Sequence, residues 1–177
     1  MSMVNLGRIT VSENSLNRAR NIVRDKTAEG GKKTAQSVLS SLQQMMPGWN
    51  ITTNYREWGE GFRNIEIDEN MLTNMANDPD VMIKYKALIL DLEDAVPELE
   101  EWAQHNDVEA MKFGISIDVD GGIRAMGLMR TLLGEEVNTT FDLPTDRLTW
   151  SDIIRQKLDA FNAGQVQSAD GSRSWVG

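Results

Sequence analysis

The sequence predicts an α+β domain in which helices pack on one face of an antiparallel sheet built from two β-hairpins. Three observations predict this fold class. Apolar residues recur at helical spacing in four segments, over about 12–26, 35–46, 68–77 and 79–94. Apolar and polar residues alternate in 49–55 and 111–119, as they do in strands with one buried and one solvent-exposed face. Turn signals separate the segments, which gives the order α-α-β-β-α-α-β-β-α.

The predicted helices carry recognisable end signals. Pro47-Gly48 ends the second helix, because the residue before a proline resists the helical region. Asp68 caps the third, and Asp78-Pro79 starts the fourth with a capping carboxylate and a proline at the first helical position. Pro97 is expected to kink or restart that helix before a further turn or two. A last helix over 149–164 begins with a T-x-x-D capping box.

Two hairpins supply the predicted sheet. The first pairs WNITTNY with FRNIEI across the loop REWGEG. The second follows from ISIDVDGG, where Asp120-Gly121 suits a type I′ turn that pairs Val119 with Gly122 and continues as a strand over 123–130. A calcium loop started at Asp118 is excluded, because the required glycine and glutamate positions are filled by Ile123 and Met129.

The chain length suits one domain with extensions at its ends. We expect an N-terminal helical arm or extension over 1–35, an α+β domain over 36–164, and a disordered tail over 165–177. Whether the arm packs on the domain stays open from the sequence.

The charge is unevenly distributed. Residues 1–48 carry seven Lys or Arg and three Asp or Glu, whereas the rest of the chain carries eleven and 24. An acidic body repels phosphate backbones, so we expect no nucleic-acid partner. No apolar run is long enough to span a membrane, and the first residues lack the apolar core of a signal peptide. We therefore expect a cytoplasmic protein without membrane contact, with export by a non-classical route left open.

Residue types exclude several kinds of active site. The chain has no cysteine and one histidine, so thiolate catalysis and clusters of His or Cys around a metal are excluded. His105 suits a helix end. TAEGGKKT lacks the first glycine and the preceding strand of a phosphate-binding loop, which favours a polar linker. We expect no catalytic residue, no metal ligand and no cofactor.

The loop REWGEG holds the candidate binding residues Glu57, Trp58 and Glu60. Three interpretations stay open: the indole packs on the core, the loop contacts a partner protein, or the two carboxylates catalyse hydrolysis beside the aromatic ring. The acidic run DLEDAVPELEEWAQ is either a solvated helix face or a docking face for a basic partner.

Over residues 38–125 the chain resembles a family of uncharacterised bacterial proteins known only as a domain of unknown function. The resemblance rests on an I-x-I-x(4)-L-x-x-M-A-x-D-P element, here formed by Ile65, Ile67, Leu72, Met75, Ala76, Asp78 and Pro79. The family often has proline where Glu69 or Asn70 stands here. The resemblance implies a bacterial, non-membrane α+β domain and carries over no catalytic residue.

The leading functional hypothesis is a non-enzymatic domain that binds another protein of unknown identity. The alternatives are a carboxylate-dependent hydrolase and a small acidic inhibitor of the phage type. The oligomeric state does not follow from the sequence.

Overall fold

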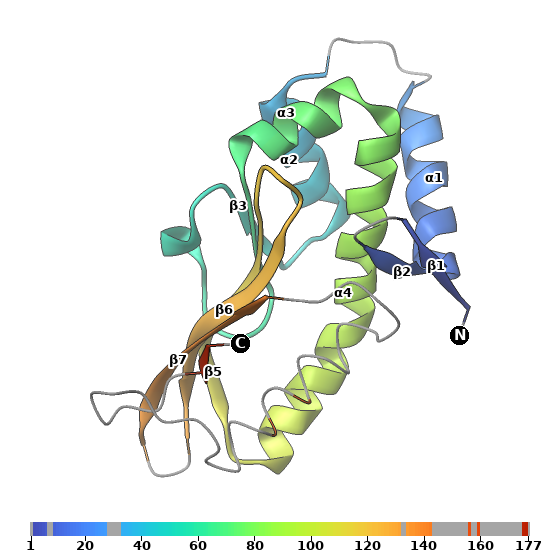
Figure 1. The fold of residues 1–177 in the computed structure, drawn as a ribbon. Helices are drawn as coiled ribbons and strands as arrows, with labels where there is room; N and C mark the ends of the chain where they lie inside the picture. The colour runs from blue at the N-terminus through green and yellow to red at the C-terminus, as the bar shows by residue number, and fades with distance from the viewer. Residues whose placement is uncertain are drawn as a thin grey trace.

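A computed structural model describes residues 2–6, 9–27, 33–131, 134–142, 156, 159 and 175–176. Helices and strands follow one another in mixed order along the chain (Figure 1). The elements are β1 (Met3–Asn5), β2 (Thr10–Ser12), α1 (Glu13–Thr27), α2 (Ala35–Met45), β3 (Asn50–Thr52), the 3-10 helix η1 (Tyr55–Glu57), β4 (Asn64–Ile67), α3 (Glu69–Asn77), α4 (Pro79–His105), β5 (Glu109–Ile117), β6 (Ile123–Arg130), β7 (Glu136–Asp142) and β8 (Trp175–Val176).

The main sheet is mixed and has the strand order β3-β4-β5-β6-β7-β8. Strands β3, β4 and β5 run parallel, β5, β6 and β7 are antiparallel, and the two-residue β8 lies parallel to β7. Strands β1 and β2 form a separate antiparallel pair. The predicted α+β class is confirmed, whereas the prediction of an antiparallel sheet made from two hairpins is wrong.

The first predicted hairpin is a parallel pair. Ile51 of β3 lies beside Ile65 of β4. The chain between the strands includes η1 and leads from the carboxyl end of β3 back to the opposite end of the sheet, where β4 begins. Two antiparallel strands can be joined by a tight turn, but two parallel strands need a longer connection. The residues between Thr52 and Asn64 provide that length, and the sequence pattern alone does not distinguish such a return from a hairpin loop.

The second predicted hairpin is present, with a different turn. Ile117 pairs with Ile123, and the amide of Asp118 donates to the carbonyl oxygen of Gly122 at 3.0 Å. The loop therefore has three residues, of which Gly121 has φ +77° and Asp120 does not have a positive φ, so the predicted type I′ turn is wrong. The Asp118 carboxylate explains the wider loop, because its Oδ1 accepts the amide protons of Asp120 and Gly122 at 3.0 and 2.7 Å.

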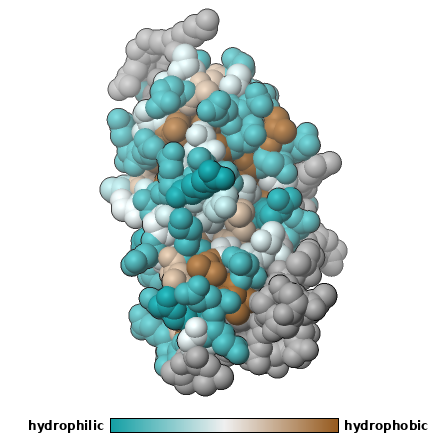
Figure 2. All heavy atoms as spheres, turned by 90° about the vertical axis from the view of Figure 1, so that its left-hand side faces the viewer, coloured by the Kyte–Doolittle hydropathy of each residue, from teal (hydrophilic) through white to brown (hydrophobic). Residues whose placement is uncertain are grey.

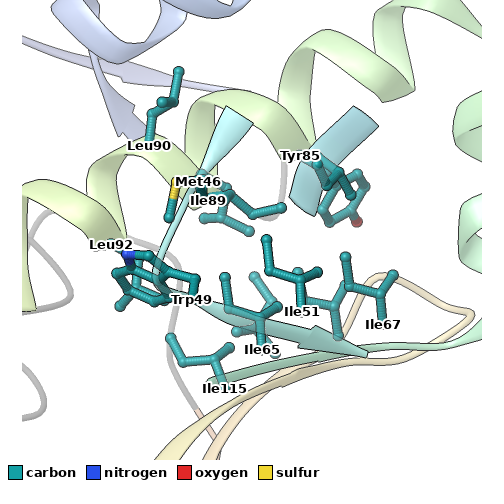
Figure 3. Close-up of a cluster of buried hydrophobic side chains, with 14 of the residues drawn as sticks. Met46, Trp49, Ile51, Ile65, Ile67, Tyr85, Ile89, Leu90, Leu92 and Ile115 are labelled. Atoms are coloured by element: carbon teal, nitrogen blue, oxygen red, sulfur yellow. The ribbon is translucent and has the colours of Figure 1, made fainter. Parts of the chain in front are cut away.

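The hydrophobic core lies between the sheet and the helices. Figure 3 shows Ile51, Ile65, Ile67 and Ile115 of the strands directed towards Ile89 of α4. Alternation along the strands places these side chains on one face. Helices α2, α3 and α4 lie on that side of the sheet, and α1 packs against α4 (Figure 1).

The N-terminal arm is part of the same core. Ile9, Val11 and Ala19 are fully buried and belong to the hydrophobic cluster that includes the sheet. Ser12 stands just before α1, where its hydroxyl accepts the amide proton of Ser15 at 3.1 Å as a helix cap. Asp91 of α4 accepts the amide and the hydroxyl protons of Ser12 at 2.7 and 2.5 Å, so the start of α1 is fixed to α4.

Helix α4 continues through Pro97 instead of ending there. A proline inside a helix removes one backbone hydrogen bond, so the later turns need another source of stability. Leu99 and Trp102 are buried on those turns, and the indole N–H of Trp102 donates to Asp159 at 2.5 Å. Most of the predicted last helix and most of the predicted tail lie outside the described residues. None of the described helices has the combined length and apolar character needed to cross a membrane.

Candidate functional site

The three residues that the sequence suggested for binding lie in the connection between β3 and β4. Glu57 and Glu60 are exposed, but Trp58 is only 4% exposed. The burial of the indole favours packing as the role of Trp58. The neighbouring Tyr55, which the sequence did not single out, is 45% exposed and meets the Trp58 ring edge to face at a centroid distance of 6.4 Å.

One buried side chain holds this connection in place. Asn64 of β4 is fully buried, and its Nδ2 donates to the carbonyl oxygens of Gly59, Gly61 and Phe113 at 3.1, 3.2 and 2.8 Å. Its Oδ1 accepts the amide proton of Gly59 at 2.8 Å and a side-chain proton of Asn50 at 3.0 Å. Because both the Nδ2 and the Oδ1 of this buried side chain are hydrogen-bonded, the loop that carries Tyr55 is fixed to the sheet.

A hollow of about 350 Å³ opens at the carboxyl ends of β4 and β5, beside the start of α3. We call it the acidic hollow. The carboxyl ends of parallel strands are a common place for binding sites in sheets of this kind. The lining contains four carboxylates and no lysine or arginine; it consists of Thr53, Glu66, Asp68, Glu69, Asn70, Ser116, Ile117 and Asp118.

Three of these carboxylates also hold the local structure. Glu66 accepts the amide proton of Tyr55 at 3.3 Å and the hydroxyl proton of Ser116 at 2.8 Å. Asp68 caps α3 by accepting the amide proton of Asn70 at 2.7 Å, and Asp118 accepts the protons of the hairpin turn. None of the four carboxylates in the acidic hollow forms an ion pair with a residue in the described ranges.

A second hollow, of about 300 Å³, lies beside the β5–β6 turn and is also lined by residues of α3 and α4. We call it the hairpin hollow. Its lining mixes apolar and polar side chains: Met71, Asn74, Asn77, Asp78, Val81, Lys84, Tyr85, Val119 and Asp120. Val119 is 42% exposed; with Tyr55, it makes up the exposed large hydrophobic residues of the described part of the chain.

The side of the molecule that carries η1 is mostly hydrophilic, with small and separate hydrophobic patches (Figure 2). Large continuous apolar patches mark obligate interfaces, whereas a polar face with a few exposed apolar residues is typical of interfaces that form and dissociate. The face that carries η1 has this second character.

The acidic run of α4 has a different environment. Arg18 of α1 pairs with Glu93 at 3.2 Å and with Asp94 at 3.6 Å. Arg63 pairs with Glu100 at 3.1 Å through two parallel hydrogen bonds. The chain's own arginines therefore meet several of the carboxylates that the sequence offered as a docking face for a basic partner.

The described residues include Glu57, Glu60 and His105, which the sequence raised as candidates for chemistry. No group of three His, Asp or Glu side chains in the described ranges is placed to hold a metal ion. Glu57 and Glu60 line neither hollow. His105 is in the last turn of α4, where its Nδ1 lies 2.9 Å from the carbonyl oxygen of Glu101.

The segment from Trp49 to Thr139 matches the family described as "Protein of unknown function (DUF6033)". The chain belongs to the DUF6033 family. The resemblance to a family of unknown function that the sequence suggested is thereby confirmed. The DUF6033 match includes both hollows and the η1 loop, whereas α1 and α2 precede it. No curated protein and no solved structure matches this chain.

Sequence reasoning missed the acidic hollow because it placed the first strand pair in a hairpin, and it missed the hairpin hollow because no local signal places the β5–β6 turn beside α3 and α4. With β3, β4 and β5 parallel, Glu66 and Asp118 come to the same end of the sheet. One signal was available: polar residues follow each of these strands, in IEIDEN and ISIDVD. In a parallel arrangement such residues gather at one edge.

Proposed function

We propose that this DUF6033 protein is a non-enzymatic domain that binds another protein through the η1 loop and the acidic hollow. The contact residues are Tyr55, Glu57 and Glu60 on the loop, together with the carboxylates of the hollow. The partner presents lysine or arginine side chains, because the lining of the hollow is acidic and contains no cation. Trp58 is buried beneath the loop and supports it by packing.

The observation that carries this proposal is a contrast between two acidic regions. On α4 the carboxylates of Glu93, Asp94 and Glu100 are paired with arginines of the same chain. Around the acidic hollow, the carboxylates of Glu66, Asp68, Glu69 and Asp118 have no cationic partner among the described residues. Complementary charge on a partner both speeds and orients association, so the unpaired region is the better docking face.

Tyr55 supports the proposal as an anchor. Tyrosine is enriched at the centres of protein interfaces, because its large ring is rigid and carries a hydroxyl group. Its backbone amide is bound by Glu66 and its ring is braced by Trp58. A side chain held in this way loses little conformational entropy when a partner covers it.

The two alternatives receive less support. A hydrolase that uses Glu57 and Glu60 needs both carboxylates to face one pocket, and neither lines a hollow. An inhibitor that mimics nucleic acid needs a continuous negative face, and the acidic run of α4 is interrupted by the paired Arg18 and Arg63.

The test is capture of a partner from a lysate of the source organism, followed by a binding measurement with the purified partner. Wild type is compared with Tyr55→Ala and with the double variant Glu57→Lys, Glu60→Lys. Glu13→Lys, at an exposed position of α1, is the control for a change of charge outside the proposed contact surface. We expect the loop variants to weaken binding about 10-fold or more and the control to leave it unchanged. Equal binding by all the variants, or turnover of a substrate that depends on Glu57 or Glu60, would contradict the proposal.

A further inference from the structure

The hairpin hollow has the make-up of a pocket for one apolar side chain. Met71 and Tyr85 are each 4% exposed and form its buried part, and Val119 adds an apolar wall. The volume of about 300 Å³ is at the small end of the range found for ligand pockets. The exposed Asn74 and Asn77 supply amide groups at the rim.

The exposure of Val119 is itself informative. It is the first residue of the three-residue hairpin loop, a place where polar residues and glycine are usual. A β-branched apolar residue that is 42% exposed gains only part of the burial free energy of its side chain in the isolated chain, and the rest is gained when another molecule covers it.

The two hollows are adjacent parts of one surface. Asp118 lines the acidic hollow, and the next residue along the chain, Val119, lines the hairpin hollow. The same holds on α3, where Asn70 lines the acidic hollow and Met71 lines the hairpin hollow. Because two walls continue from one hollow to the other, one short segment of a partner can contact both. One segment with an apolar residue close to a lysine or arginine therefore fits the whole surface.

The turn between the hollows is held rigidly. The Asp118 carboxylate accepts two amide protons of the turn, and the Tyr85 hydroxyl lies so close to Gly121 that a Cβ there would come within 2.2 Å of it. Figure 3 shows the Tyr85 hydroxyl directed away from the helix and towards the strands. A pocket whose wall is already ordered costs little to fill.

The charge around the hairpin hollow also favours a segment that contains a lysine or arginine. Asp78 and Asp120 line it, and its one lysine, Lys84, lies over the Tyr85 ring at 5.7 Å from the centroid. With the carboxylates of the acidic hollow next to it, the surface favours a cationic segment over an acidic one.

We infer that the hairpin hollow receives an apolar anchor residue of the partner, while the acidic hollow receives a lysine or arginine from the same short segment. This inference rests on the proposed function and deepens it. It names the chemistry of the bound segment: an apolar residue within a few positions of a basic residue.

The experiment uses the full chain and a library of short random peptides displayed on phage. Peptides selected by wild type are synthesised, and their affinities are measured for Val119→Ser, Asn74→Arg and Glu69→Lys. Asn74→Arg places a large side chain in the hairpin hollow, and Gln44→Arg, at an exposed position of α2, adds the same charge elsewhere as the matched control. Thermal unfolding of each variant confirms that it is folded.

We expect selected peptides to combine apolar and basic residues. Asn74→Arg and Glu69→Lys should each weaken their binding about 10-fold or more, and Val119→Ser by a smaller factor of about 3, while Gln44→Arg has no effect. Shifts of the Val119 and Gly121 amide signals in nuclear magnetic resonance spectra would place the peptide in the hairpin hollow.

Two results overturn the inference and separate it from the proposed function. If selected peptides respond to Tyr55→Ala and Glu69→Lys but not to Asn74→Arg or Val119→Ser, the hairpin hollow takes no anchor and the proposed function still stands. If no peptide is enriched, or if the enriched peptides are acidic, both the inference and the basic-partner proposal fail.

Discussion

Tyr55 and Trp58 meet edge to face, with an interplanar angle of 88°, yet Tyr55 is exposed and Trp58 is buried. The two aromatic residues of the η1 loop therefore have separate roles. Trp58 fixes the loop, and Tyr55 is the ring that the loop presents to solvent. The distinction predicts opposite outcomes when each ring is removed.

Trp58→Ala should lower the free energy of unfolding by about 3 kcal/mol, because a large buried side chain is lost and a cavity is left. Tyr55→Ala should lower it by less than about 1 kcal/mol but should weaken partner binding about 10-fold or more. Urea denaturation measures the first effect and a binding assay the second. A Tyr55→Ala protein that binds normally would refute the anchor role.

Trp58→Phe is the matched control for the indole. The buried Nε1 of Trp58 has no hydrogen-bond partner among the described residues, so replacing the indole by a phenyl ring loses none of the hydrogen bonds that these residues form. We expect a loss of less than about 1.5 kcal/mol in the free energy of unfolding. A loss equal to that of Trp58→Ala would mean that the indole N–H has a partner that matters.

Asn64→Ala should be among the most destabilising changes in the loop region. It leaves the amide and carbonyl groups of Gly59 without the Asn64 side chain and removes the bond to Phe113. Buried groups without partners cost about 1–3 kcal/mol each, so we expect a total loss of about 3 kcal/mol or more. Asn50→Ala, which removes one bond, should cost about 1 kcal/mol. Equal losses in denaturation would show that Asn64 is not the centre of the network.

Gly114→Ala should force β4 and β5 apart. A Cβ at Gly114 would lie 2.2 Å from the carbonyl oxygen of Asn64, a backbone atom that cannot turn aside. Gly61→Ala is the control: Gly61 has φ +85° but open space around it, so only the conformational cost of about 1–2 kcal/mol applies. We expect Gly114→Ala to lose more stability than Gly61→Ala, measured by thermal unfolding of the two proteins under the same conditions. An equal loss would contradict the steric explanation.

The contact between Ser12 and Asp91 should contribute more to stability than the ion pairs of Arg18. Ser12 is buried and gives Asp91 two short hydrogen bonds, whereas the side chains of Arg18 and Glu93 are 40% and 34% exposed. A double-mutant cycle with Ser12→Ala and Asp91→Ala should give a coupling of about 1.5 kcal/mol or more. The cycle for Arg18 and Glu93 should give less than about 1 kcal/mol and should fall with salt. The opposite ranking would contradict this account of how the arm is held.

The helices were predictable because their signals are local. Asp68 caps α3, and Asp78 with Pro79 starts α4, as the sequence indicates. These signals act within one turn of helix and need no knowledge of distant residues. The hairpin after Ile117 was predictable for the same reason. Its loop has three residues instead of the predicted two, because the Asp118 side chain accepts the amide proton of Gly122.

The direction of β3 relative to β4 was not predictable, because it depends on contacts between distant segments. Gly114 allows β5 to lie close to Asn64 of β4, and the buried Asn64 side chain binds the η1 loop that connects β3 to β4. Alternation along a strand gives its buried face but not the direction of its neighbour. Tyr55 and the acidic hollow were missed in consequence, since their positions follow from that pairing.

The most direct test of the central claim is site-specific photo-crosslinking in cells of the source organism. A photoreactive phenylalanine analogue replaces Tyr55 in one strain and Gln44 of α2 in another, both at exposed positions. The account predicts a covalent adduct with one partner protein from position 55, lost when Glu57 and Glu60 are changed to lysine, and no such adduct from position 44. The same adducts from both positions, or none from position 55, would contradict it.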